Sequence, residues 1–261
     1  MADGDYERGR DREIASLAAQ LRRLRVVRSA RGPRAPRVLV LNGWAASPQA
    51  WDLCRFPRER IFTYLEQLDG LPERVLTESP ETDRFILVGW SMGGSGALRL
   101  AAAFPGRVAG LVLVGATPRM MEEKETGWRG MSPRRLEALR YGVELTRGAG
   151  LFGVPEGKPN PYLVDTPENL NLGIRYLLET DIRADLERTF PSGTPQPFPV
   201  HIFQSERDGI VRAANADYLK RIFPSAEITR VPGTEHALSI LIPEEIDAAV
   251  ARMVAISSTN E

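Results

Sequence analysis

Ser91 stands at the centre of the sequence GWSMG at 89–93, which matches the pattern G-x-S-x-G. The pattern follows an apolar run, FILV at 85–88, and leads into a run of small residues that ends at Phe104. A turn between a strand and a helix holds such a serine in a strained backbone conformation that exposes its Oγ, and the glycines let the neighbouring backbone pass closely. We therefore predict that Ser91 is a nucleophile. A phosphate-binding turn is the alternative, but neither G-x-G-x-x-G nor G-K-S/T is present at this turn.

The chain has two histidines, His201 and His236. A serine hydroxyl is a poor nucleophile until a base takes its proton, and histidine is the usual base near neutral pH. His236 lies in GTEHA at 233–237, a loop between the last predicted strand and the last predicted helix, so we predict that it is the base. His201 lies inside the apolar run VHIFQ at 200–204, which favours a packed, hydrogen-bonded histidine.

Asp208 follows that run in the turn SERDG at 205–209. The third member of a catalytic triad holds the imidazole in one tautomer and stabilises its cation. When the nucleophile lies on a strand-turn-helix, the chain order is Ser, then Asp or Glu, then His. Asp208 precedes the candidate base by 28 residues (236 − 208), which is enough for a helix, a strand and a loop. Glu206 is the near alternative for the acid, and Asp181 and Asp185 are distant ones.

Backbone N–H groups are needed to stabilise the negative oxygen of a tetrahedral intermediate. Met92, the residue after the nucleophile, is one predicted donor. The loop NGWA at 42–45 follows the first predicted strand, and Trp44 is the second predicted donor, with its ring forming a wall of the substrate site. Trp90 is a further candidate for substrate contact. Ordinary aromatic packing is the alternative for both indole rings, and it leaves the backbone role unchanged.

The elements that position these residues follow from short apolar runs. Strand, helix and strand at this spacing predict βαβ units, and so an α/β fold with a mostly parallel central sheet flanked by helices. The predicted strands are RVLVL at 37–41, FILV at 85–88, VAGLVLV at 108–114, VHIFQ at 200–204 and EITRV at 227–231.

The middle of the chain differs, because helical patterns at 133–146 and 167–179 alternate there with Gly- and Pro-rich segments. We predict a helical cap over the carboxyl edge of the sheet, where open α/β sheets bind ligands. The predicted domains are an N-terminal helix and linker at 1–36, a core at 37–117 and 198–261, and the cap at 118–197.

Composition excludes several classes of function. Lys+Arg and Asp+Glu both number 34, so no whole-chain field attracts nucleic acid or a membrane surface. Two histidines and the single Cys54, far apart, form no metal-ligand cluster, and we predict neither metal nor cofactor. Residues 1–12 lack a signal-peptide pattern, and no apolar run approaches the roughly 20 residues that span a bilayer, so we expect a cytoplasmic protein.

Four motifs together resemble those of the α/β-hydrolase superfamily, and within it the pimeloyl-(acyl-carrier-protein) methyl ester esterases of biotin synthesis: NGWAAS at 42–47, GWSMGG at 89–94, SERDGIV at 205–211 and GTEHA at 233–237. The segment 172–183 resembles the end of that family's cap, and the resemblance extends from 38 to 256. It implies an α/β-hydrolase fold and a serine carboxylesterase. It also implies a substrate that is a methyl ester of an acyl chain on a carrier protein.

Two features depart from that family. Asn42-Gly43 stands where His-Gly is usual, and only 71–84 separate the segment IFTYLEQLDG from the nucleophile strand. The short spacing predicts that a helix flanking the sheet is reduced or lost. The predicted N-terminal helix at 11–25 is additional, and we expect it to cover the surface left bare. Both departures leave room for another acyl substrate.

Carrier proteins are acidic, so a carrier-linked substrate implies accessible basic groups on the cap. The candidates for carrier docking are Arg134, Arg135, Arg140 and Arg147. Arg140 and Arg147 share a helix face with Glu137 and Glu144 at i,i+3 and i,i+4 spacing, so surface ion pairs are an alternative for these two.

Other functions remain compatible with the motifs. An esterase for other small esters and a thioesterase share the triad chemistry, and an acyltransferase uses the same scaffold with another acceptor. A non-catalytic binding protein is the alternative from another class, and the intact Ser91, Asp208 and His236 argue against it.

Overall fold

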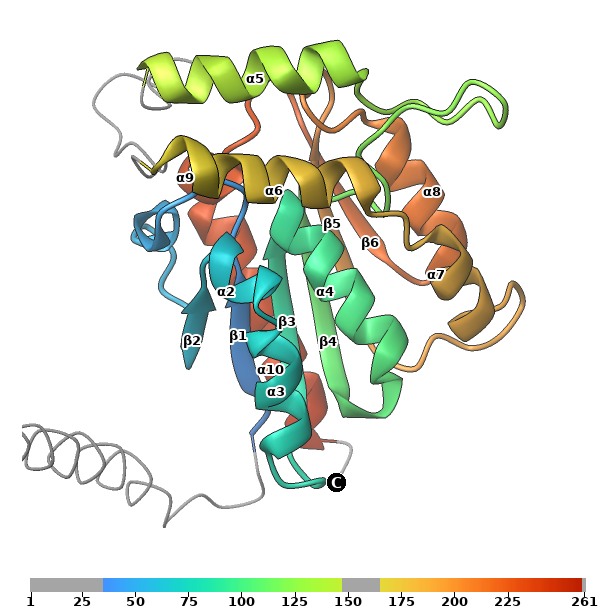
Figure 1. Cartoon of the computed structure of the whole chain (residues 1–261). Helices are drawn as coiled ribbons and strands as arrows, with labels where there is room; N and C mark the ends of the chain where they lie inside the picture. Colours follow the sequence, from blue (N-terminus) through green and yellow to red (C-terminus); the bar gives the residue numbers. More distant parts are fainter. Residues whose placement is uncertain (1–34, 147–164, 260–261) are drawn as a thin grey trace, which may run out of the picture. The chain divides into compact units, whose positions relative to one another are not determined.

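The computed structural model describes residues 35–146 and 165–259, and in these ranges six strands form one sheet in the order β2-β1-β3-β4-β5-β6 (Figure 1). Every neighbouring pair is parallel. The predicted α/β architecture is confirmed, while the predicted N-terminal helix at 11–25 lies outside the described residues. The strands are β1 (Arg37–Leu41), β2 (Arg60–Phe62), β3 (Phe85–Trp90), β4 (Val108–Val114), β5 (Val200–Ser205) and β6 (Glu227–Val231).

Strand β2 is the one that the sequence did not predict. It pairs with β1 at the edge of the sheet, with Leu39 opposite Arg60 and Leu41 opposite Phe62. Only two of its residues are apolar, and its first residue is exposed. A three-residue strand that begins with a charge has no apolar run to reveal it, and short edge strands limit unwanted pairing between sheets.

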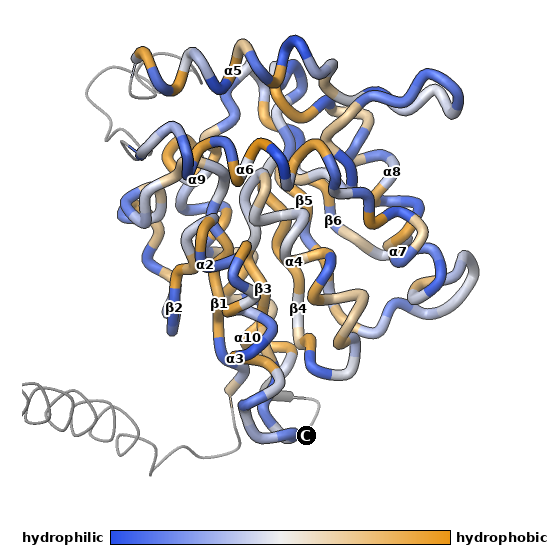
Figure 2. Tube along the Cα trace, viewed as in Figure 1, coloured by the Kyte–Doolittle hydropathy of each residue, from blue (hydrophilic) through white to orange (hydrophobic). Residues whose placement is uncertain are grey.

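Strands β1, β3 and β4 are buried on both faces of the sheet, which explains why they read as continuous apolar runs. In Figure 2, β1, β3 and β4 are largely in hydrophobic colours. Val40 and Val88 belong to a core cluster that includes residues of α9 (Leu238–Leu241) and α10 (Pro243–Thr259). Leu39 and Leu87 belong to a second cluster, which includes residues of α3 (Leu71–Glu78), α4 (Met92–Ala103) and α8 (Ala214–Ile222).

The segment before the nucleophile strand keeps short helices. Besides α3, it forms α2 (Tyr64–Leu68), which begins with a capping box between Thr63 and Glu66. Gln67 of α2 is buried and donates to Asn42 O at 2.8 Å, so this short helix braces the loop that follows β1. The flanking helix is therefore reduced rather than lost. Two 3₁₀ turns, η1 (Pro48–Trp51) and η2 (Pro105–Arg107), complete this half of the chain.

The cap helices begin where the sequence pattern predicted. They are α5 (Pro133–Thr146) and α6 (Pro167–Glu179), of which α6 also ends as predicted, and a shorter helix α7 (Arg183–Thr189) follows. Proline in the first turn suits a helix start, and Thr166 caps α6 by accepting a bond from Asn169 N. Figure 1 shows α5 and α6 lying above the end of the sheet where α4 begins. This is the carboxyl edge, as expected for a cap.

A cluster of ion pairs joins the start of the cap to the residues between α6 and α7 and to the first residue of α7. Arg119, shortly after β4, pairs with Asp181 at 2.6 Å, and Arg183 pairs with Glu123 at 2.9 Å. Burial opposes ionisation of Asp181, but bonds from Arg183 and Arg119 outweigh it and lower the pKa of its carboxyl to about 2. Residues 36–261 form one compact unit, so the domain boundaries at 118 and 197 stay a prediction. No helix in the described residues is long and apolar enough to cross a membrane.

Candidate active site

The backbone at Ser91 is strained, as the motif predicted. Its φ of 56° and ψ of −119° lie where side chains with a Cβ rarely occur. The strain is held from both sides, because Ser91 N donates to Val114 O of β4 at 3.0 Å and Ser91 O accepts from Gly94 N at 2.9 Å. Met92 begins α4 directly after the serine, so its N–H belongs to the first turn of the helix, where backbone donors have no partner within the helix.

Glycine is required beside the serine because the backbone of other segments passes very close. A Cβ on Gly93 would lie 2.6 Å from Asn42 O and would overlap Leu41 O. A Cβ on Gly89 would lie 2.5 Å from Gly93 O. The turn therefore packs directly against the end of β1, which brings the serine beside the loop that carries Trp44.

His236 and Asp208 form a buried pair. His236 Nδ1 and Asp208 Oδ2 lie 2.8 Å apart, and the two side chains are 4% and 0% exposed. Asp208 Oδ1 accepts from the backbone N–H groups of Ile210 at 2.7 Å and Val211 at 3.0 Å. These donors fix one side of the carboxyl group and leave Oδ2 directed at the imidazole.

The alternative acids lie elsewhere. Glu206 is exposed beside the same turn, Asp181 belongs to the ion cluster of the cap, and Asp185 pairs with Arg188 at 2.5 Å. Of the four carboxyl groups considered from the sequence, the structure brings Asp208 to His236.

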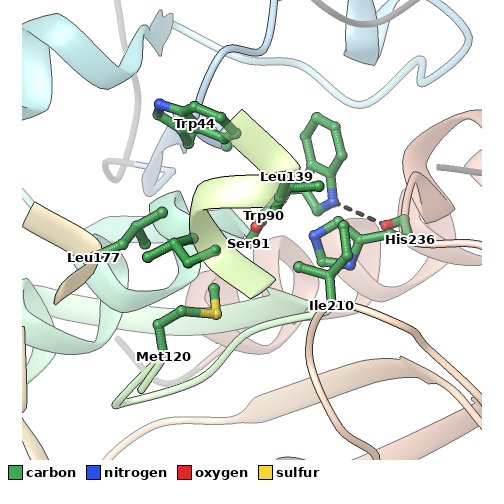
Figure 3. Close-up of a pocket in the computed structure, with 10 residues that line it drawn as sticks. Trp44, Trp90, Ser91, Met120, Leu139, Leu177, Ile210 and His236 are labelled. Carbon is green, nitrogen blue, oxygen red and sulfur yellow. Dashed lines mark hydrogen bonds between the residues drawn. The ribbon is translucent and has the colours of Figure 1, made fainter. Parts of the chain in front are cut away.

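Trp90 has a role that the sequence did not indicate. Its indole Nε1 donates to the backbone carbonyl of His236 at 2.9 Å, as the dashed line in Figure 3 shows. The side chain is 1% exposed, and its ring centroid lies 5.8 Å from that of the imidazole. The residue before the nucleophile therefore ties the base loop to the end of β3, and it also lines the pocket.

The loop after β1 is braced by Asn42. Its Nδ2 donates to Ser47 O at 2.8 Å, and its Oδ1 accepts from Gly43 N at 3.1 Å. An asparagine can make both bonds with one side chain. This gives a structural reason for Asn42, at the position where His is usual in the family that the sequence resembles. Ala45 has a φ of 54°, so the backbone is strained here too, immediately after Trp44.

The indole of Trp44 lies between the core and the cap. Its Nε1 donates to Leu170 O of α6 at 3.1 Å. A Cβ on Gly173, one turn further along α6, would lie 2.7 Å from Trp44 Nε1. The glycine therefore lets the cap helix pass directly over the ring, and the ring forms part of the wall of the pocket below.

Trp44, Trp90, Ser91 and His236 line the same pocket (Figure 3). Helices α5 and α6 of the cap supply part of its wall, and the rest comes from the ends of the core strands. Among the described residues that line it, only Ser91 and His236 carry nucleophilic or titratable groups, and the others are glycine or apolar. The lining residues are Gly43, Trp44, Trp90, Ser91, Met120, Leu136, Leu139, Leu177, Ile210 and His236.

Comparisons with known proteins agree with this arrangement. Residues 60–158 match the model of the alpha/beta hydrolase fold family. The chain is 27% identical over 247 residues to the pimeloyl-(acyl-carrier protein) methyl ester esterase of Nitrosomonas europaea, a match that covers 80% of this chain and 92% of that protein. The corresponding esterase of Nitrosospira multiformis is 25% identical, covering 83% and 94%. This chain has the α/β-hydrolase fold and is a carboxylic ester hydrolase, similar to these two esterases.

Solved structures show the same fold for this α/β-hydrolase. An esterase from Exiguobacterium antarcticum superposes with a TM-score of 0.63 at 17% identity, covering 84% of this chain and 92% of that one. A hydrolase from Oleispira antarctica also gives a TM-score of 0.63, at 15% identity, covering 86% and 92%.

The other histidine of the esterase is part of the sheet. His201 Nε2 and Thr229 Oγ1 lie 2.8 Å apart, and the imidazole stacks on Phe203 with centroids 4.2 Å apart. Burial lowers the pKa of His201. The predicted packed histidine is confirmed.

The predicted docking arginines have different surroundings. Arg140 pairs with Glu137 and Glu144, both at 2.8 Å, as the helical spacing indicated. Arg135 donates to Gly209 O at 2.7 Å, and Arg134 is exposed. The fourth candidate, Arg147, lies outside the described residues. Over the described ranges, no group of three or more His, Cys, Asp or Glu side chains of the esterase could hold a metal ion.

Proposed function

We propose that this esterase is a serine carboxylesterase in which Ser91 is the nucleophile, His236 the general base and acid, and Asp208 the residue that orients His236. The observation that carries the proposal is the buried pair of His236 and Asp208, because His236 lines the same pocket as a serine with strained backbone. Side chains from three distant parts of the chain meet there, which suits acyl transfer through a triad.

The reaction follows from these roles. Ser91 Oγ attacks the ester carbonyl as His236 Nε2 takes its proton, and the backbone N–H groups of Met92 and Trp44 stabilise the oxyanion. The intermediate collapses, the bond from carbon to the alcohol oxygen breaks, and His236 returns its proton to the leaving alcohol. Water then attacks the acyl-enzyme with the same base, which releases the acid and restores Ser91. Asp208 keeps Nδ1 protonated throughout and stabilises the imidazolium.

Pimeloyl-acyl-carrier-protein methyl ester is the proposed substrate, and the reaction frees the distal carboxylate of the pimeloyl chain in biotin synthesis. The relatives' names support this choice, as do the motifs from 42 to 237. The apolar lining of the pocket suits a chain of methylene groups, and a carrier-linked reaction fits the cytoplasmic location expected from the sequence.

A hydrolysis panel tests the substrate. Methyl esters of acyl chains of graded length are compared as free esters and as the same acyl groups on acyl carrier protein, with Ser91→Ala as the blank. We expect the highest kcat/KM for the carrier-linked pimeloyl methyl ester, with release of methanol. A preference for short free esters would indicate a general esterase. Release of the carrier thiol would indicate a thioesterase, and product formation only with an added alcohol or thiol would indicate an acyltransferase.

Fluorophosphonate labelling tests the nucleophile independently of the substrate. The reagent bonds covalently to an activated serine, so the parent should label at Ser91 and Ser91→Ala should not. A protein that only binds ligands on this fold would label in neither form. Labelling that persists in Ser91→Ala would move the nucleophile elsewhere.

We further propose that basic groups of α5 guide the acidic carrier. Arg134 is exposed, whereas Arg140 pairs with two glutamates and Arg135, also exposed, donates to Gly209 O. Arg134→Glu should lower kcat/KM for the carrier-linked ester and spare a short free ester. The loss should shrink with salt, because the Debye length falls from about 10 Å at 0.1 M to about 3 Å at 1 M. Arg221→Glu, on core helix α8, is the control, and an equal loss for both esters would assign Arg134 to the cap's own structure.

A further inference from the structure

Gln204 lies near the end of β5, and its side chain is completely buried. Its amide Nε2 faces three oxygens of the following turn: Ser205 O at 3.1 Å, Val211 O at 3.0 Å and Asp208 Oδ2 at 3.5 Å. The first two oxygens mark the two ends of the turn, and the third belongs to the proposed catalytic acid. The amide group therefore occupies the centre of the turn.

The chemistry of these neighbours fixes the orientation of the amide. All three oxygens accept hydrogen bonds, so the group among them must be the NH₂ of the side chain and not its carbonyl oxygen. Two N–H bonds are shared among three acceptors, and the bond to Asp208 is the longest. Asp208 Oδ2 is also the atom that lies 2.8 Å from His236 Nδ1.

The carboxylate of Asp208 is thus held on both oxygens. Oδ1 accepts from the backbone of Ile210 and Val211, which fixes one side of the group. The amide of Gln204 lies 3.5 Å from the other oxygen, where even a weak hydrogen bond opposes rotation of the carboxylate about its last bond. A misplacement of about 1 Å in a catalytic group can cost roughly 100-fold in rate, so this restraint bears directly on the bond to the base.

We propose that Gln204 is a positioning residue, which holds Asp208 Oδ2 in line with His236 Nδ1. Its amide also links the two ends of the turn at 205–211, the acid turn. This inference rests on the proposed function, because it takes Asp208 as the acid of the triad. Gln204 touches neither substrate nor reacting atoms in this mechanism and acts through Asp208.

A double-mutant cycle tests the inference. Gln204→Met keeps the length of the side chain and removes the donor. Gln204→Met, Asp208→Asn and the double variant are assayed with a short p-nitrophenyl ester. We expect Gln204→Met to lower kcat about 100-fold with little change in KM. The double variant should be no slower than Asp208→Asn alone, because the carboxylate through which Gln204 acts is already gone.

Gln204→Glu serves where the methionine variant fails to fold, since it retains the shape of glutamine. The introduced carboxyl group donates a hydrogen bond only while it is protonated. As pH rises it ionises and two carboxylates face each other, so kcat of the variant should fall further below that of the parent. This additional pH dependence should vanish when Asp208→Asn is also present. A glutamate that acted only on the fold would keep it.

Gln196→Met is the matched control. Gln196 also donates its amide to a backbone carbonyl, Phe198 O at 2.6 Å, in the loop before β5 and outside the lining of the pocket. Gln196→Met removes the same amide group at a place away from Asp208, so kcat and its pH dependence should stay at the parent level. Urea unfolding of all variants shows which are folded at the assay temperature.

The outcomes separate the two proposals. If the losses from Gln204→Met and Asp208→Asn multiply in the double variant, Gln204 only supports the fold and the inference fails, while the triad stands. The same holds if the pH dependence of Gln204→Glu persists without the Asp208 carboxylate. If Asp208→Asn alone keeps the activity of the parent, the proposed triad fails and the role of Gln204 fails with it.

Discussion

The nucleophile turn, residues 89–94, and the acid turn, residues 205–211, lie at the same edge of the sheet but are held by different kinds of contact. The nucleophile turn is held by backbone, with Ser91 N bonded to Val114 O and Gly93 pressed against the end of β1. The acid turn has backbone bonds at its start, from Glu206 N to Val231 O and from Arg207 N to Gly233 O, but side chains hold the rest of it, chiefly the carboxylate of Asp208 and the amide of Gln204.

This difference follows from what each turn must present. The nucleophile turn must present a hydroxyl and a neighbouring N–H at fixed places, which requires an unusual backbone and therefore glycines. The acid turn must only direct one oxygen at an imidazole, which side-chain hydrogen bonds can do on ordinary backbone. A Cβ on Gly209 would meet just Arg135 Nη2, at 3.7 Å. One turn tolerates almost no change of backbone shape, and the other depends on particular polar groups.

The largest effect is expected at the chemical centre of the comparison. Ser91→Ala or His236→Ala should each lower kcat by about 10⁶-fold, and the double variant should lose little more, because the two groups act as one unit. Steady-state or single-turnover hydrolysis of a p-nitrophenyl ester measures this. Multiplied losses in the double variant would contradict a shared proton transfer.

Within the acid turn, Asp208→Asn should lower kcat by about 10⁴-fold, because the amide favours the wrong tautomer of the base. Glu206→Gln, two residues earlier and exposed, is the matched control and should retain full activity. The reverse ranking would move the acid to Glu206 and remove the basis for the comparison.

In the nucleophile turn, Gly93→Ala adds a methyl group that must displace the carbonyls of Leu41 and Asn42. The free energy of unfolding should fall by about 3 kcal/mol, at the upper end for overpacking, because backbone cannot move aside as a side chain can. Urea denaturation measures this. Gly106→Ala, where no atom lies within 4 Å of the added carbon, is the control and should change little.

The smallest effect is expected for Gly209→Ala in the acid turn. The added carbon makes an ordinary contact with a flexible arginine, so the free energy of unfolding should stay within about 0.5 kcal/mol and kcat should be unchanged. Thermal unfolding and the ester assay check both values. A loss as large as that of Gly93→Ala would show that the two turns are equally rigid.

The same difference explains what could be predicted from the sequence. An unusual backbone conformation restricts which residue types can occupy a position, so the glycines around Ser91 indicated the nucleophile turn in the sequence. Pro133 and Pro167 likewise marked the starts of the cap helices. His236 could be chosen because only one other histidine competes, and that one lies within an apolar strand.

The sequence did not reveal hydrogen bonds between side chains and groups far away along the chain. The bond from Trp90 to His236 O spans 146 positions, and that from Arg135 to Gly209 O spans 74. Residue type indicates that Gln204 can donate and accept, and apolar neighbours indicate burial, but neither identifies Asp208 as its partner. Pocket residues such as Leu139 and Leu177 read simply as the apolar faces of two helices, because periodicity does not show which part of a face lines a cavity.

The order of strands in the sheet has a consequence for how the enzyme comes into being. The sheet extends from β3 through β4 and β5 to β6 in the order of synthesis, and the base lies 145 residues after the nucleophile (236 − 91). At about 5–20 residues per second, a growing chain carries Ser91 for roughly 7–30 s before His236 is made. Helix α10, which follows the base, then covers β4 through Met253 beside Gly110. Under the proposed mechanism, hydrolysis becomes possible only after His236 is made, and until then a nascent chain on the ribosome holds Ser91 without its base.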